Sequence, residues 1–255
     1  MRQGLYALLT ILVLATLLTG CGGKDAADEP LPDPQALLQK SVAELEQASS
    51  LELEIDTSGY PVMLDLELDL PQDIPLVFYY AHGLFQAPDR LSATIQFGLG
   101  AVTTMAEMII LGHDHYFRGD LLTANRWLNA ELIPGFSPDL LFSNEIGIPH
   151  ALKAITQLEM IGRQRLRGRE VYYLRGAVQA SAIYALTFGL MRTTEGELRI
   201  EVYVGTKDWR VLQLTLTEPP PQDADTDEPT IWKISFLNYN QEVNITAPSL
   251  DDGEG

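Results

Sequence analysis

Cysteine and basic residues are both scarce in this sequence. Cys21 is the single cysteine among 255 residues, so an intramolecular disulfide and a catalytic thiol elsewhere in the chain are excluded. Only 17 Lys and Arg stand against 35 Asp and Glu, which gives a formal net charge of −18. A surface of this charge repels the phosphates of nucleic acids and of anionic lipids. We therefore expect no nucleic-acid partner, and any lipid contact has to come from a covalent anchor or an apolar cavity.

The motifs of common enzyme classes are also missing. The sequence has no Gly-x-Ser-x-Gly elbow, no phosphate-binding loop and no Rossmann glycine pattern. His113 and His115 could place two imidazoles on one strand face, but no further histidine or cysteine is close in sequence, so we interpret both as structural. Residues 223–227 resemble the start of a calcium loop but lack its glycine and its closing glutamate. We therefore expect no enzyme activity, no metal and no cofactor.

The start of the chain carries the firmest functional signal. Arg2 precedes an apolar run over residues 5–18, which is typical of a secretory signal and too short for a membrane helix of about 20 residues. The run ends in Leu-Thr-Gly-Cys, which resembles the bacterial lipobox, in which the cysteine is diacylated and becomes the mature N-terminus. The alternative is a chance cysteine after an ordinary signal peptide. We expect residues 1–20 to be a lipoprotein signal peptide, with lipid attachment at Cys21 and an extracytoplasmic anchor in the cell membrane.

A short acidic segment and one amphipathic helix follow. Residues 21–34 are small, acidic and proline-bearing, which predicts a flexible tether. From residue 35 to about residue 50 the apolar side chains recur at helical spacing, and Asp33 or Pro34 suits the N-cap and first turn. The sequence therefore predicts a helix with one buried face at the start of the folded domain.

Most of the remaining sequence alternates with a period of two, which is typical of half-buried β-strands. Acidic residues alternate with leucine and isoleucine over residues 51–56, which favours a solvated outer face over paired acid–base residues. Strands are predicted at residues 51–56, 64–70, 76–85, 91–99, 105–111, 115–117, 158–166, 171–174, 198–204, 212–216 and 232–236.

Three segments break this pattern. Residues 127–150 contain several prolines and predict short helices and loops, with a helix at about 151–158. Residues 177–191 are nearly uncharged and do not alternate, which predicts one helix packed on the sheet. Residues 218–229 predict a long acidic, proline-rich loop. Together these elements predict a single α+β domain over residues 35–249, with a disordered tail at 250–255.

The apolar rows of the strands predict a broad curved sheet with an apolar concave face. Six residues are the candidates for that face, beneath residues 177–191: Leu91, Ala93, Ile95, Phe97, Ile200 and Val202. The helices could fill the concavity as an ordinary core, or they could roof a cavity that holds lipid chains. Core leucines and lipid-binding leucines look alike in a sequence, so both alternatives stay open at this point.

The order of short motifs along the chain resembles the LppX/LprAFG lipoprotein family, related in fold to the LolA/LolB lipoprotein carriers. The motifs are the lipobox, Ala87-Pro88, Ile110-Leu111-Gly112, the strand Val202-Tyr203-Val204, and Val243-Asn244-Ile245-Thr246-Ala247-Pro248 after Tyr239. The resemblance implies a strongly curved antiparallel half-barrel with helices covering the open concave side.

The same resemblance implies a function. We expect a membrane-anchored bacterial lipoprotein that binds lipid or acylated glycolipid in a hydrophobic cavity and carries it within the cell envelope, with any envelope transport partner unknown. The alternatives are an envelope interaction or assembly factor with a filled core, and a sensor that binds lipid without moving it. The acidic loop and the insertion at 127–158 depart from the family pattern, so the identity of the lipid does not transfer.

Overall fold

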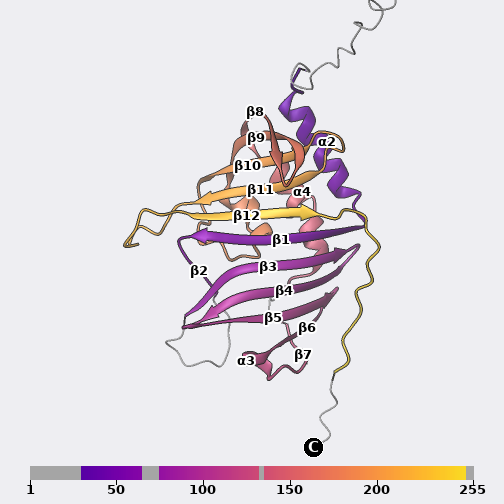
Figure 1. The fold of residues 1–255 in the computed structure, drawn as a ribbon, viewed down its shortest axis with the longest axis vertical. Helices are drawn as coiled ribbons and strands as arrows, with labels where there is room; N and C mark the ends of the chain where they lie inside the picture. The colour runs from indigo at the N-terminus through magenta and orange to yellow at the C-terminus, as the bar shows by residue number, and fades with distance from the viewer. Residues whose placement is uncertain (1–29, 65–74, 132–134, 251–255) are drawn as a thin grey trace, which may run out of the picture. The chain divides into compact units, whose positions relative to one another are not determined.

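A single large antiparallel sheet dominates the fold (Figure 1). The computed structural model describes residues 30–64, 75–131 and 135–250. The chain divides into two compact units, residues 1–31 and 32–255, and every element below belongs to the second. The strands are β1 (Ser50–Gly59), β2 (Val62–Met63), β3 (Leu76–Gln86), β4 (Arg90–Leu99), β5 (Val102–Leu111), β6 (Asp114–Gly119), β7 (Leu128–Asn129), β8 (Thr156–Leu166), β9 (Arg169–Gln179), β10 (Glu197–Gly205), β11 (Val211–Glu218) and β12 (Thr230–Leu237).

The strand order is β7-β6-β5-β4-β3-β1-β12-β11-β10-β9-β8, and β2 pairs with β3. β1 and β12, from opposite ends of the domain, thus lie side by side at the centre of the sheet. Among the described strands, β7 and β8 stand at the two ends of this order and do not pair with each other, so the sheet is not closed into a barrel. Figure 1 shows that the sheet is curved. The predicted α+β half-barrel is confirmed.

Helices cover the concave face over one half of the sheet. Helix α2 (Pro34–Glu46) begins as predicted, because a side-chain oxygen of Asp33 accepts a hydrogen bond from the backbone N–H of Ala36 at 2.8 Å. Its apolar stripe contacts α4 (Ile148–Lys153), β8 and β11. The short 3₁₀ helix η4 (Ala180–Ile183) packs against α4 and β9.

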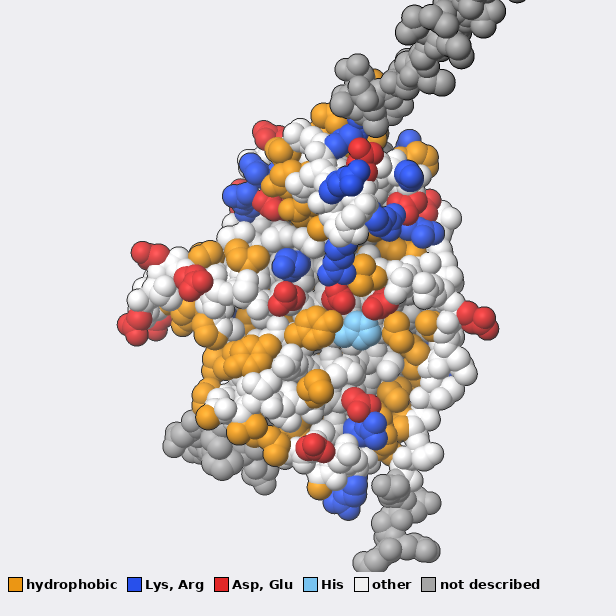
Figure 2. Space-filling model, viewed as in Figure 1, with side chains coloured by type: hydrophobic (Ala, Val, Ile, Leu, Met, Phe, Trp, Pro, Cys, Tyr) orange, Lys and Arg blue, Asp and Glu red, His pale blue; other side chains and the backbone are white. Residues whose placement is uncertain are grey.

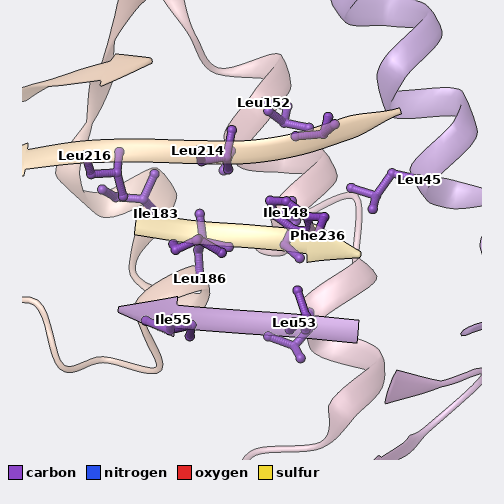
Figure 3. Close-up of a cluster of buried hydrophobic side chains, with 14 of the residues drawn as sticks. Leu45, Leu53, Ile55, Ile148, Leu152, Ile183, Leu186, Leu214, Leu216 and Phe236 are labelled. Carbon is purple, nitrogen blue, oxygen red and sulfur yellow. The ribbon is translucent and has the colours of Figure 1, made fainter. Parts of the chain in front are cut away.

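These helices and the strands below them form a tightly packed core. Figure 3 shows this cluster, with these side chains labelled: Leu45, Leu53, Ile55, Ile148, Leu152, Ile183, Leu186, Leu214, Leu216 and Phe236. All of them are buried. The half of the sheet from β8 to β12 therefore has a filled interior, which we call the packed half.

The helical segments differ from the prediction. The predicted helix at 151–158 is displaced to Ile148–Lys153, because Pro149 suits the first turn of a helix and Thr156 already pairs with β9. The prediction of one helix over residues 177–191 is wrong. Ala177 to Gln179 complete β9 and pair with β10, and the rest forms η4 and a second 3₁₀ turn, η5 (Ala185–Thr187).

The physical reason for this error lies at Phe188 and Gly189. Their φ angles are 52° and 73°, which an α-helix cannot contain. The segment lacks charge because most of its side chains are buried. A buried apolar segment without alternation does not by itself specify a helix.

Three further predictions fall partly or wholly outside the described residues. These are the signal peptide with Cys21 and most of the tether, the strand at 64–70, and the tail at 250–255. Within the residues that the structure describes, no helix is long and apolar enough to cross a membrane. The long loop between β11 and β12 is present as predicted, over residues 219–229.

Candidate functional site

An apolar cavity of about 530 Å³ lies on the concave face of the other half of the sheet, from β1 to β6. Its lining comes from strands, from helix α3 (Asp120–Thr123) and from the segment after η4. The lining residues are Leu53, Ile55, Met63, Leu64, Phe78, Ala81, Gly83, Leu91, Ala93, Ile95, Phe97, Ala106, Met108, Phe117, Leu122, Tyr184, Thr187, Phe188, Gly189, Leu190, Met191, Arg192 and Trp232. Cavities of this size and composition are typical of sites for small apolar ligands.

The strand register builds the floor of the cavity from two rows of side chains. The first floor row crosses the strands as Leu53, Gly83, Ala93, Met108 and Phe117, each paired with the next. The second floor row is Ile55, Ala81, Ile95 and Ala106. Paired residues of neighbouring strands point to the same face, so both rows face the concave side.

Small residues in both rows leave the space. Ala81, Gly83, Ala93 and Ala106 carry a methyl group or less, and larger side chains surround them. A Cβ added at Gly83 would already contact Leu91 and Ala93, at 3.4 and 3.5 Å. A shift of register at Tyr79 in β3 also keeps both Phe78 and Ala81 on the concave side, because a bulge inserts one extra residue into the strand.

Residues 184–192 form the roof. Thr187 ends η5 and donates a side-chain hydrogen bond to the carbonyl of Tyr184 at 3.2 Å. Phe188 packs against Phe136, with ring centroids 5.4 Å apart. Arg192 fixes the end of the roof, since it donates to the carbonyl of Pro61 at 2.9 Å and to the hydroxyl of Thr230 at 3.0 Å. The roof is therefore held largely by contacts with residues that are far away in the sequence.

A buried carboxylate supports this end of the roof. Glu218 has no exposed surface, and it accepts hydrogen bonds from the indole N–H of Trp232 at 3.0 Å and from the backbone N–H of Thr193 at 2.8 Å. The guanidinium of Arg192 lies 3.7 Å from it. A buried charge is costly unless it is paired in this way. Glu218 thus holds Trp232, a cavity residue, and the segment that follows the roof.

The lining is almost wholly apolar, and its polar groups lie in the roof. Arg192 is the one charged residue among the described lining residues, and its counter-ion Glu218 lies outside the lining. Two lining side chains are strongly exposed, Met63 at 46% and Tyr184 at 53%, so the cavity opens to solvent beside them. The arrangement can bind an apolar chain, and the lining residues that the structure describes include no nucleophile paired with a base.

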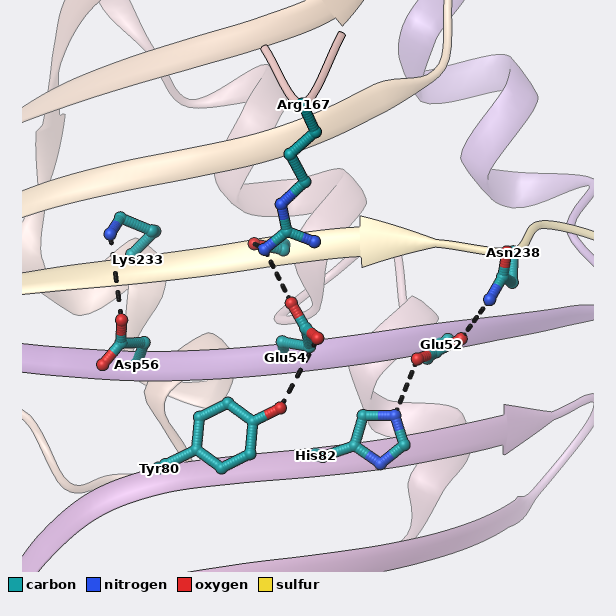
Figure 4. Close-up of polar contacts among 9 residues, drawn as sticks. Glu52, Glu54, Asp56, Tyr80, His82, Arg167, Lys233 and Asn238 are labelled. Carbon is teal, nitrogen blue, oxygen red and sulfur yellow. Dashed lines mark hydrogen bonds and ion pairs between the residues drawn. The ribbon is translucent and has the colours of Figure 1, made fainter. Parts of the chain in front are cut away.

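The convex face of the sheet carries both charged side chains and exposed apolar ones, such as Met105. Figure 2 shows acidic and basic side chains side by side over the middle of this face. In Figure 4 three carboxylates of β1 are each paired: Glu52 with His82 at 2.7 Å, Glu54 with Arg167 at 2.7 Å, and Asp56 with Lys233 at 3.8 Å. Each carboxylate of the acidic row predicted from the sequence therefore has a partner from outside β1: His82 lies on β3, Lys233 on β12 and Arg167 in the turn between β8 and β9.

The environment of Glu52 shifts its acidity. Partial burial acts to raise the pKa of Glu52, but hydrogen bonds with His82 and Asn238 and attraction to Arg167 outweigh it and lower this pKa below its usual value. The pKa of Tyr80 is raised by partial burial and by its neighbour Glu54. Neither shift serves the cavity, which lies on the opposite face.

The histidine pair does not converge on one site. The Nε2 atom of His115 is buried and lies 2.9 Å from the carbonyl oxygen of Phe136, whereas His113 is exposed in the preceding turn. Over the described ranges, no group of three or more His, Cys, Asp or Glu side chains could hold a metal ion.

The structure separates the six predicted cavity residues into two groups. Leu91, Ala93, Ile95 and Phe97 line the cavity, side by side along β4. Ile200 and Val202 are fully buried on β10, within the core cluster, and lie outside the lining. Cys21 lies outside the described residues.

Sequence reasoning missed the small floor residues and the support of the roof. Ala81, Gly83 and Ala106 stand at concave positions of adjacent predicted strands, so their small size was a usable signal. No pattern in a single sequence predicts that Arg192 lies next to Glu218.

Comparison with known proteins gives consistent matches over nearly the whole domain. The family model described as "LppX_LprAFG lipoprotein" matches residues 33–245. The chain is 24% identical over 251 residues to the lipoarabinomannan carrier protein LprG of Mycolicibacterium smegmatis (strain ATCC 700084 / mc(2)155), covering 97% of this chain and 96% of that protein.

Two crystal structures have a similar fold. LprF from Mycobacterium bovis superposes with a TM-score of 0.61 at 14% identity, covering 86% of this chain and 99% of that one. Lipoprotein LppX from Mycobacterium tuberculosis superposes with a TM-score of 0.54 at 16% identity, covering 84% of this chain and all (100%) of that one.

Proposed function

Since the chain belongs to the LppX_LprAFG lipoprotein family, we propose that it binds lipid or acylated glycolipid in the cavity beneath residues 184–192 and carries it within a bacterial cell envelope. The observation that carries this proposal is an apolar cavity of about 530 Å³ beside a half of the same sheet whose concave residues are buried under helices. The name of the relative LprG, a lipoarabinomannan carrier protein, supports the same class of ligand.

The cavity supplies the binding energy. Each methylene moved from water to an apolar surface contributes about 0.8 kcal/mol, so a chain of about ten methylenes would gain roughly 8 kcal/mol before the costs of ordering. The two floor rows offer apolar contact along the acyl chain of the lipid. Gly83 has no side chain and Ala93 has only a methyl group, so the acyl chain can lie close to the sheet. The protein's role in this proposal is to shield the lipid from water.

The N-terminal anchor completes the proposal. Diacylation at Cys21 would keep the domain on the extracytoplasmic face of the membrane, because two acyl chains are needed for stable anchoring. The acidic tether after Cys21 would let the domain reach a lipid donor and an acceptor from one attachment point. Binding and carriage need no bond to form or break, so we propose no catalytic residue and no cofactor.

Lipid extraction tests the binding part of the proposal. The protein is purified from membranes in its lipidated form and extracted with organic solvent, and the released lipids are identified by mass spectrometry. We expect about one non-covalently bound lipid per protein. A protein that releases no lipid and takes none up from vesicles would contradict the proposal and favour an interaction factor.

A transfer assay tests the carrier part. The protein is mixed with donor vesicles that contain a fluorescent phospholipid and with unlabelled acceptor vesicles. A carrier increases transfer in proportion to its concentration. Lipid uptake without any transfer would instead indicate a sensor that binds lipid without moving it.

A further inference from the structure

We infer that Glu218 determines which head groups the cavity accepts. By neutralising Arg192, this carboxylate makes the cavity favour lipids with uncharged head groups over anionic lipids. The inference rests on the proposed function, because it specifies the class of lipid for the same cavity.

The polar head of a bound lipid lies near Arg192. The cavity opens to solvent beside its exposed lining residues Met63 and Tyr184, and we call this end the mouth. Arg192 belongs to the mouth, because it lines the cavity and its guanidinium donates to the carbonyl of Pro61, two residues before Met63. A lipid whose acyl chain lies in the cavity therefore has its polar head at the mouth, within reach of Arg192.

The acyl chain points away from the mouth along β3 and β4. Met63 pairs with Val77 near the start of β3, and Gly83 lines the cavity further along this strand. Leu91 lies at the same far end, because it pairs with Phe85, two residues beyond Gly83. The methyl end of the chain thus lies near Gly83 and Leu91.

The charge of Arg192 is already compensated inside the protein. Its guanidinium lies 3.7 Å from the carboxylate of Glu218, which has no exposed surface. Salt screens a buried charge of this kind much less than an exposed one. Two of the five N–H groups of the guanidinium donate to Pro61 and Thr230, and others are left to donate to an acceptor oxygen of the ligand, such as an ester carbonyl. That contact needs no charge on the lipid.

An acidic loop reaches the same end of the cavity. The carbonyl of Pro229 accepts a hydrogen bond from the backbone N–H of Tyr60 at 3.2 Å, and the Tyr60 ring centroid lies 4.7 Å from the guanidinium of Arg192. Asp227 and Glu228 directly precede Pro229, and both are exposed. An anionic head group at Arg192 is therefore repelled by Glu218 and by this loop, whereas an uncharged head group is not.

Coulomb's law gives the size of the effect of Glu218. A phosphate oxygen that accepts from Arg192 at ~2.9 Å would lie about 6 Å from the carboxylate of Glu218. At that distance one negative charge weakens the binding of another about 3-fold with the dielectric constant of water, and about 100-fold with an effective dielectric constant of about 20. An uncharged head group avoids this loss.

Two lipids with identical acyl chains test the inference. Binding of a pyrene-labelled galactosyl diacylglycerol, which is uncharged, and of the matching phosphatidylglycerol, which is anionic, is measured with the purified, delipidated lipoprotein in the same buffer. We expect the protein to bind the uncharged lipid more tightly. Equal or tighter binding of the phosphatidylglycerol would overturn the inference and leave the proposed function standing. Failure to bind either lipid would instead refute the proposed function.

Substitution of Glu218 locates the source of the preference. Glu218→Gln removes the charge but keeps the size of the side chain and an oxygen acceptor for the indole of Trp232. It should strengthen the binding of the phosphatidylglycerol by about 3- to 100-fold and leave the binding of the uncharged lipid unchanged. Glu52→Gln is the matched control, because it makes the same change in net charge on the convex face, and it should leave both affinities unchanged.

Two results would contradict the role of Glu218. One is an unchanged preference in folded Glu218→Gln protein, and the other is an equal change in the Glu52→Gln control, which would assign the effect to net charge alone. If Glu218→Gln does not fold, the exposed pair Asp227→Asn and Glu228→Gln decides. This double variant should also strengthen the binding of the phosphatidylglycerol, by a smaller factor because solvent screens exposed charges. No change in the double variant would refute the inference.

Discussion

Filling the cavity from its floor is the most informative perturbation of this protein. Ala93 lies at the centre of the first floor row, between Gly83 on β3 and Met108 on β5, and its methyl group faces the cavity. Ala93→Trp places nine additional heavy atoms in that space, which displaces roughly five methylenes at about 30 Å³ each. The lost contact amounts to about 4 kcal/mol at ~0.8 kcal/mol per methylene, or an affinity about 1,000-fold weaker.

The same substitution should have little effect on stability. In the delipidated protein the empty cavity gives the indole room, so we expect the free energy of unfolding of this form to change by less than about 1.5 kcal/mol. In a packed core an added ring costs about 1–3 kcal/mol or more, because neighbouring side chains are forced from their rotamers. The effect on stability therefore distinguishes a cavity from a core at this position.

Two control variants calibrate the result. Val202→Trp makes the same kind of change in the packed half, where Val202 is fully buried, and should destabilise strongly. Thr94→Trp adds the ring one residue along β4, on the convex face, and should affect neither stability nor lipid. The assay combines urea unfolding with quantification of bound lipid. If Ala93→Trp destabilises as much as Val202→Trp and the parent protein holds no lipid, the cavity interpretation is refuted.

Three further predictions concern the anchor, the buried carboxylate and the convex face. Cys21→Ser should yield an uncleaved or soluble precursor, and a mature-size product that still fractionates with membranes would contradict the lipobox. Glu218→Ala leaves the indole of Trp232 without its acceptor and removes the counter-ion of Arg192, so urea unfolding should show a loss of about 3 kcal/mol; a loss below about 1 kcal/mol would refute its role in holding the roof. The lowered pKa of Glu52 means that its contribution to stability is complete above the unfolded-state pKa of 4.5 and is lost as the pH falls through the folded-state pKa. Glu52→Gln should therefore flatten the decline of stability below about pH 4.5, and an unchanged decline would contradict this assignment.

The strands and their buried faces were predictable because alternation is a local property. The spacing of Leu91, Ala93, Ile95 and Phe97 predicts one face of β4, and the structure places all four on the cavity. The N-cap at Asp33 was similarly readable, since capping depends on residues within one turn.

The position of each strand across the sheet was not predictable in this way. Ile200 and Val202 show the same alternation as β4, but they are fully buried outside the cavity, and alternation cannot tell a face buried in the core from one that lines a cavity. The roof was missed for a related reason. Its path depends on Arg192 and Glu218, whose contacts join segments far apart in the chain, and on the left-handed backbone at Phe188.

The most direct test of the central claim is to locate a bound lipid by photo-crosslinking. A fatty acid with a diazirine group near its methyl end is bound to the purified lipoprotein and irradiated, and the labelled residues are identified by tandem mass spectrometry. We predict labels on β3 and β4 near Gly83 and Leu91 and on the roof near Phe188. Labels confined to β8, β9 and β10, or spread evenly over the surface, would contradict lipid binding in this cavity.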